Sequence, residues 1–105
     1  MKYLLCTVLL CVLSSGTALA HKVNIFAWVA AGTVYCETYF PDGRPVKDGQ
    51  IIVLDAEDNE LLTGRTDDEG LFNFKITTRS DLTIIIDASM GHRNSIILKK
   101  GDLQP

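Results

Sequence analysis

The alternation of apolar and polar residues after position 20 most constrains what this chain can fold into. Alternating segments and short apolar runs follow one another about every ten positions, and turn-forming residues separate them. A period of two is typical of β-strands, and no segment here has the 3.6-residue period of a helix. We predict seven strands: Lys22–Val29, Thr33–Phe40, Gln50–Asp55, Leu61–Thr66, Leu71–Thr77, Leu82–Ala88 and Arg93–Leu98.

Seven short strands without a helix favour an all-β fold. We expect two packed antiparallel sheets of immunoglobulin-like type, because strands that are apolar on one face must bury that face against another sheet. The run Ile84-Ile85-Ile86 indicates that the sixth strand is central and buried on both faces. If Val23, Ile25 and Val29 face inward, the outer side of the first hairpin gathers four aromatic residues: Phe26, Trp28, Tyr35 and Tyr39.

The first twenty residues are typical of a secretory signal peptide. Lys2 precedes an apolar run from Tyr3 to Leu13, and Ala18-Leu19-Ala20 supplies small residues at a cleavage site. The alternative is an uncleaved anchor, although the run is too short for an ordinary membrane span. We therefore predict a signal peptide at 1–20, a sandwich domain at 21–99 and a polar tail at 100–105, in a periplasmic or otherwise extracytoplasmic protein.

Charge and cysteine content exclude several classes of protein. The formal charge of −3 becomes −4 when cleavage removes Lys2, which argues against nucleic-acid binding because that needs a basic face. Of three cysteines, only Cys36 remains after cleavage, so an internal disulfide is excluded. Cys36 shares a strand face with Val34 and Phe40, and we expect a buried, inert thiol.

The two histidines are the candidate site residues. Cleavage after Ala20 makes His21 the first residue, and His92 follows the sixth strand. In a run of antiparallel strands, successive loops alternate between the two ends of the molecule. The chain start therefore shares an end with the loops after the second, fourth and sixth strands. When the first and last strands also lie side by side in parallel, both imidazoles come within reach of one ion.

Nitrogen donors in this arrangement favour a transition metal. The α-amine and one ring nitrogen of His21 form a chelate, and His92 supplies a third nitrogen. Three nitrogens in one plane suit Ni(II) or Cu(II) better than zinc, which prefers a tetrahedral set. Asp87 is a candidate fourth ligand or a carboxylate that orients an imidazole; alternatively, it bonds to turn amides. Met90 is a candidate soft ligand for Cu(I), or a packing residue.

Two loops resemble those of carboxypeptidase-regulatory-like, transthyretin-like sandwich modules. The first is Gly43-Arg44-Pro45-Val46, before a strand, and the second is Thr66-Asp67-Asp68-Glu69-Gly70-Leu71-Phe72-Asn73-Phe74, entering another. The resemblance concerns the fold and implies no chemistry. Within the second loop we expect Asp67 to cap the turn backbone and Gly70 to adopt a positive φ.

A second resemblance covers the whole mature chain and concerns function. Its motifs are His21-Lys22-Val23-Asn24-Ile25-Phe26-Ala27, Val34-Tyr35-Cys36-Glu37-Thr38-Tyr39-Phe40 and Asp87-Ala88-Ser89-Met90-Gly91-His92-Arg93. They resemble small extracytoplasmic accessory components of bacterial energy-coupling-factor-type nickel and cobalt uptake transporters. The resemblance implies that His21 and His92 bind Ni(II) or Co(II) for delivery to membrane transporter components.

Two departures from that pattern are visible. Ser89 stands where the family has glycine, and the chain ends at Pro105 without a C-terminal membrane span. Permanent docking on a transporter and action as a soluble carrier therefore both stay open.

The sequence bears on four other functions. An enzyme is not expected, because no serine or cysteine has a plausible base in its sequence context. Asp67, Asp68 and Glu69 match no calcium loop. Two alternatives to nickel or cobalt binding remain. One is a copper-binding protein that uses the same residues, and the other is a metal-free module that binds a partner through the aromatic residues of the first hairpin.

Overall fold

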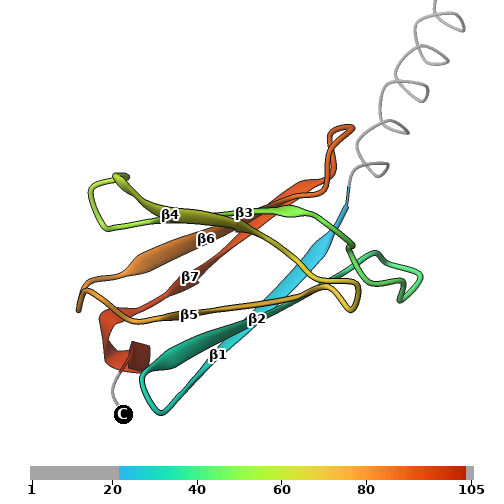
Figure 1. The fold of residues 1–105 in the computed structure, drawn as a ribbon. Helices are drawn as coiled ribbons and strands as arrows, with labels where there is room; N and C mark the ends of the chain where they lie inside the picture. The colour runs from blue at the N-terminus through green and yellow to red at the C-terminus, as the bar shows by residue number, and fades with distance from the viewer. Residues whose placement is uncertain (1–21, 104–105) are drawn as a thin grey trace, which may run out of the picture.

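The computed structural model describes residues 22–103, so the predicted signal peptide and His21 lie outside the described residues. The seven predicted strands are all present, with ends shifted by at most two residues (Figure 1). They are β1 (Asn24–Ala30), β2 (Thr33–Tyr39), β3 (Gln50–Leu54), β4 (Glu60–Arg65), β5 (Leu71–Lys75), β6 (Leu82–Asp87) and β7 (Arg93–Leu98).

The strands form two antiparallel sheets, which confirms the prediction of an all-β sandwich with seven strands. One sheet has the order β1-β2-β5 and the other β4-β3-β6-β7. β6 lies between β3 and β7, as its isoleucine run predicted, and Ile84 and Ile86 are fully buried. Every ladder pairs antiparallel strands, and β1 also lies beside β7 across the edge between the two sheets.

The core lies between the sheets and follows the alternation of the sequence. In β2, Val34, Cys36 and Thr38 are buried while the residues between them are exposed. β3 and β6 contribute Ile51, Val53, Leu82, Ile84 and Ile86 from the opposite side. Burial of these aliphatic side chains is the main stabilising term at this size, since a cavity costs about 2–5 kcal/mol for each Leu or Ile cut back to Ala.

The turn between β4 and β5 is built as its sequence predicted. Asp67 Oδ1 accepts hydrogen bonds from the amides of Glu69 and Leu71, both at 2.9 Å, and so caps the turn. Gly70 has φ +77°, a left-handed conformation that costs glycine little. The Gly70 carbonyl then accepts bonds from both the amide and the hydroxyl of Thr38, each at 2.9 Å, which ties the turn to β2.

Thr66 fastens the loop after β2 to the end of β4. Its buried hydroxyl donates to the Val46 carbonyl at 2.6 Å and accepts from the Gly49 amide at 2.8 Å. Both backbone groups belong to a chain segment that lies outside the named strands, so neither has a ladder partner to replace the hydroxyl. Thr66 therefore fixes the position of the 41–49 loop, which lines the candidate site described below.

Replacing Thr66 with valine should lower the free energy of unfolding by about 2–3 kcal/mol, because it leaves a buried carbonyl and a buried amide unpaired. Urea denaturation of the purified protein measures the change. Thr38→Val is the matched control and should lose under about 1 kcal/mol, because the Gly70 carbonyl keeps its bond from the Thr38 amide. Equal losses in the two variants would contradict this account.

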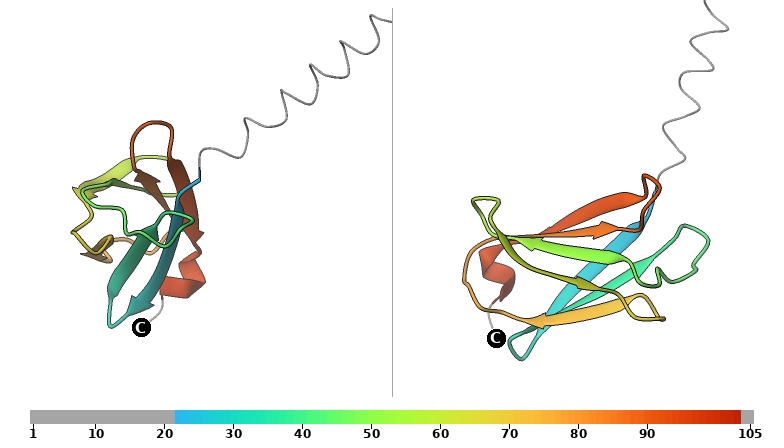
Figure 2. Two further views of the ribbon diagram at one scale, coloured as in Figure 1. Left: turned by 90° about the vertical axis from the view of Figure 1, so that its right-hand side faces the viewer. Right: turned by 45° about the horizontal axis from the view of Figure 1, so that its top comes forward.

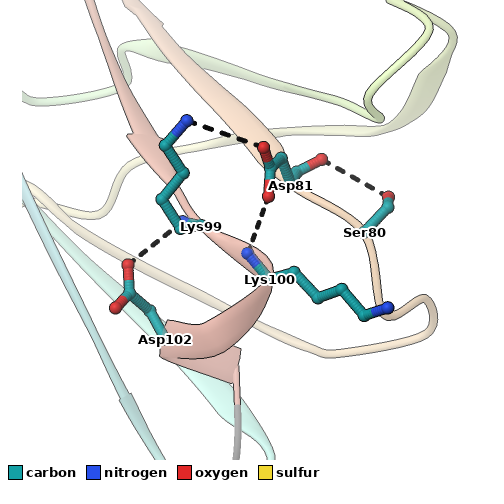
Figure 3. A network of polar contacts seen from close by, with 5 residues as sticks. All are labelled: Ser80, Asp81, Lys99, Lys100 and Asp102. Carbon is teal, nitrogen blue, oxygen red and sulfur yellow. Dashed lines mark hydrogen bonds and ion pairs between the residues drawn. The ribbon is translucent and has the colours of Figure 1, made fainter.

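The C-terminal segment differs from the prediction of a polar tail. Residues Lys100–Leu103 form a 3-10 turn, η2, and the Leu103 side chain is buried in the core. Figure 3 shows how polar groups hold the turn: the Lys100 amide donates to Asp81 Oδ1 at 2.7 Å, and the Lys99 amide donates to Asp102 Oδ2 at 3.0 Å. The sequence prediction overlooked a single apolar residue that carries no periodicity of its own.

The ends of the sandwich are arranged as loop alternation predicted. In Figure 1 and in the right view of Figure 2 the start of β1 lies at the same end as the loop after β2 and the turn between β6 and β7. Within residues 22–103 no helix has the length and apolar character needed to cross a membrane.

Candidate functional site

The turn from Asp87 to His92 holds the histidine in a fixed position. The Ala88 amide donates to the His92 carbonyl at 2.8 Å, and the His92 amide donates to the Ser89 carbonyl at 3.0 Å. Ser89, Met90 and Gly91 all have positive φ, at 70°, 54° and 83°. Residues other than glycine rarely adopt this conformation, so the turn carries a conformational cost at Ser89 and Met90.

The His92 side chain is packed, not simply solvated. Its ring meets the edge of the Phe40 ring at a centroid distance of 5.7 Å and an angle of 81°. The Arg44 guanidinium lies 5.1 Å from the centre of the same phenylalanine ring and pairs with Asp42 at 2.7 Å. The Nδ1 atom of His92 is shielded from solvent, so an ion that reaches this ring would have to use Nε2.

The chain start runs past this turn. Val23 is fully buried, and its carbonyl accepts a hydrogen bond from the Asn94 side chain of β7 at 2.8 Å. This bond holds the beginning of the described chain against the beginning of β7, in the parallel arrangement that the sequence analysis required. Lys22 and His92 consequently line one surface hollow of about 480 Å³, which we call the histidine hollow. Its lining is Lys22, Phe40, Pro41, Asp42, Arg44, Ala88, Met90 and His92.

Asp87 is engaged by its neighbours in the β6–β7 hairpin. Asp87 pairs directly with Arg93 across the β6–β7 ladder, and its Oδ2 lies 3.5 Å from that guanidinium. Its Oδ1 accepts a bond from the Ser89 amide at 2.9 Å, which is the turn-capping role given as the alternative above. Successive residues of a strand point to opposite faces, so Asp87 lies on the outer face and the Ala88–His92 pair on the other.

Met90 does not pack, although packing was one of its two expected roles. Its side chain is 87% exposed at the tip of the turn, on the rim of the histidine hollow. Met90 stands between Ser89 and Gly91 in a turn where all three residues have positive φ.

No metal cluster is formed by residues 22–103 alone. Within this part of the chain no group of three or more His, Cys, Asp or Glu side chains lies close enough to hold an ion, and His92 is its only histidine. His21, the other predicted ligand, precedes the described residues. Sequence reasoning missed Phe40, whose ring packs against that of His92, and Arg44, whose guanidinium lies over the Phe40 ring.

Cys36 has the predicted environment. Its side chain is 1% exposed, and burial raises the pKa of the thiol to about 12. A thiol with so high a pKa is a poor nucleophile and a poor metal ligand at neutral pH, because the thiolate is the reactive form.

The four aromatic residues predicted on the outside of the first hairpin are exposed. Phe26 is 54% exposed, and Trp28, Tyr35 and Tyr39 are each between 37% and 40% exposed. Trp28 and Tyr35 face each other across the β1–β2 ladder with ring centroids 5.8 Å apart, and Phe26 lies 5.6 Å from Trp28. We call this outer surface of β1 and β2 the aromatic face.

The chain matches no known family model, no curated protein and no solved structure. Its function is therefore argued from the residues and their geometry.

Proposed function

We propose that this protein is an extracytoplasmic, non-catalytic carrier of Ni(II) or Co(II) that serves a transition-metal uptake system. In this proposal a signal peptide is removed after Ala20, the domain is an immunoglobulin-like, transthyretin-like sandwich, and the metal is passed to membrane transporter components. The observation that carries the proposal is that Lys22 and His92 line the same hollow. The residue joined directly to Lys22 is His21.

The donors would act together as follows. The α-amine and a ring nitrogen of His21 close a chelate on the ion, and His92 adds Nε2 from the far wall of the hollow. The α-amine has an ordinary pKa near 8, so a metal displaces its proton at modest cost around neutral pH. Three nitrogen donors with open positions suit an ion that must be bound and later released, because further ligands stay exchangeable.

Charge does not assist binding at this end. Lys22 contributes an ammonium group to the lining of the histidine hollow, and Asp42 is already paired with Arg44. Binding of a cation must therefore rest on coordination bonds, and its affinity should depend only weakly on salt. Cu(II) would bind the same nitrogens, and the exposed Met90 thioether favours Cu(I), so copper is the second candidate.

The test is calorimetric titration of the protein that begins at His21, as verified by mass spectrometry, with Ni(II), Co(II) and Cu(II). His92→Phe keeps the ring contact with Phe40 but removes a nitrogen donor, and should weaken Ni(II) binding by about tenfold or more. Met90→Leu is the control and should leave Ni(II) affinity unchanged; a loss confined to Cu(I) would favour the copper alternative. Unaltered Ni(II) affinity in a His21→Ala, His92→Phe double variant would end the proposal and leave the metal-free module.

A further inference from the structure

A second hollow of about 570 Å³ adjoins the aromatic face. It lies where the outer surface of β1 and β2 meets the loops after β2 and β4, and it is lined by Phe26, Glu37, Thr38, Tyr39, Gly43, Pro45, Asp68 and Glu69. Two of these residues are exposed rings and three are carboxylates. The ladder register explains the arrangement: Glu37 is paired with Phe26 on one side and with Leu71 on the other, so the carboxylate stands among apolar neighbours.

Among residues 22–103 no ion pair neutralises the carboxylates of this hollow. The ion pairs of residues 22–103 use Asp42, Asp81 and Asp87, and none of them uses Glu37, Asp68 or Glu69. The neighbouring Asp67 is the residue that caps the turn, so the turn does not need the Asp68 and Glu69 side chains. Asp68 also borders a hollow that contains Arg44 and Lys47, which leaves Glu37 and Glu69 as the less compensated charges.

The chemistry of this surface matches a basic side chain better than a metal ion. Among the described residues no three acidic, histidine or cysteine side chains approach closely enough to hold one ion, so the negative charge is spread out. A guanidinium group spans such a site, because it is planar, stacks on aromatic rings and pairs with carboxylates through several N–H groups. Beyond the hollow, Trp28 and Tyr35 extend the aromatic face and offer contacts for apolar side chains.

We propose that the aromatic face and the adjoining acidic hollow form a docking surface for a protein segment that carries arginine and apolar side chains. The arginine enters the hollow against Phe26 and Tyr39 and pairs with Glu37 and Glu69. The apolar neighbours of that arginine cover Trp28 and Tyr35. Charge complementarity selects this occupant, since the hollow gathers three carboxylates. The surface is separate from the histidine hollow and does not depend on metal binding.

The test uses two peptides and the single tryptophan of the chain. Acetyl-Leu-Arg-Leu-Arg-Leu-amide is titrated into the mature protein while Trp28 fluorescence and backbone amide chemical shifts are recorded. We expect saturable binding, with shifts centred on β1, β2 and residues 67–70, and clear weakening when ionic strength rises to about 0.15 M. The same peptide with glutamine in place of arginine should bind at least about tenfold more weakly.

Variants with matched changes of charge complete the test. Glu37→Gln together with Glu69→Gln should lower the affinity for the arginine peptide by about tenfold. The control pair is Glu57→Gln, in the exposed turn after β3, together with Glu60→Gln, at the exposed start of β4. It alters the charge equally and should leave affinity unchanged. Equal binding of the two peptides, or equal effects of the two double variants, would overturn the proposal. Binding to vesicles of anionic phosphatidylglycerol in preference to the arginine peptide would overturn it as well.

Discussion

Replacing Gly70 with alanine should lower the free energy of unfolding by about 3 kcal/mol. Two effects add at this position. The backbone has φ +77°, which a residue with a Cβ adopts at a cost of about 1 kcal/mol or more. A Cβ there would also collide with the carbonyl oxygen of Thr38, a backbone atom that cannot rotate away, and would press on the Val46 amide.

Gly43→Ala is the matched control for this prediction. Gly43 also has a positive φ, at 91°, but a Cβ built there meets nothing within 4 Å. The Gly43→Ala variant should therefore lose only the free energy that the positive φ costs an alanine, about 1 kcal/mol. Urea or thermal unfolding, followed by circular dichroism, measures both variants. Losses of the same size would show that the close approach of Gly70 to β2 adds nothing to stability.

The contrast between these glycines shows what the sequence could predict. The turn from Thr66 to Gly70 has local signals: Asp67 caps it through bonds two and four residues ahead, and Gly70 stands at its left-handed position. Both roles were predicted correctly, because they depend on neighbours along the chain. The collision at Gly70 depends on Thr38, which lies 32 residues earlier, and no periodicity or turn rule reports such a contact.

The faces of the strands could be predicted from neighbouring residues, but the order of the strands in the sheets could not. Alternation predicted that Cys36 would be buried and that Phe26 and Trp28 would be exposed, because a strand places successive side chains on opposite faces. The orders β1-β2-β5 and β4-β3-β6-β7 follow from pairings across the fold, so they were beyond sequence reasoning. Leu103 is a similar case, since an isolated apolar residue does not reveal that η2 brings it back to the core.

The candidate site was predicted in outline and not in detail. Loop alternation predicted that the start of the first strand and the turn before the last strand share one end, and Lys22 and His92 line one hollow there. His21 itself lies outside the described residues. Sequence reasoning also offered Asp87 as a fourth ligand or as a carboxylate that orients an imidazole; in the structure this side chain accepts a bond from the Ser89 amide and pairs with Arg93. The contact between Phe40 and His92 was missed, because it depends on how the loop after β2 bends over the sheet edge.

A protein that retains one methionine in front of His21 should bind Ni(II) about thirtyfold more weakly than the protein that begins at His21. The added residue converts the α-amine of His21 into a peptide nitrogen, which is not basic and is no ligand at neutral pH. The α-amine and the ring nitrogen of His21 can then no longer close one chelate ring on the metal. One nitrogen donor of the proposed set is lost. The loss of one such bond, taken as about 2 kcal/mol, corresponds to the stated change in affinity.

The dependence of affinity on pH separates coordination from a merely steric effect of the extra residue. With the free amine, a metal competes against a proton whose pKa is ordinarily near 8, so Ni(II) affinity should rise as pH increases through about 8. With the methionine present the α-amine lies one residue farther from the His21 imidazole and no longer closes the same chelate. Binding then rests on the imidazoles, whose ordinary pKa is about 6.5, and the rise should end about one unit above that value. Parallel pH profiles for the two proteins would mean that the α-amine is no ligand. In that case processing would set where the chain begins without creating a metal site.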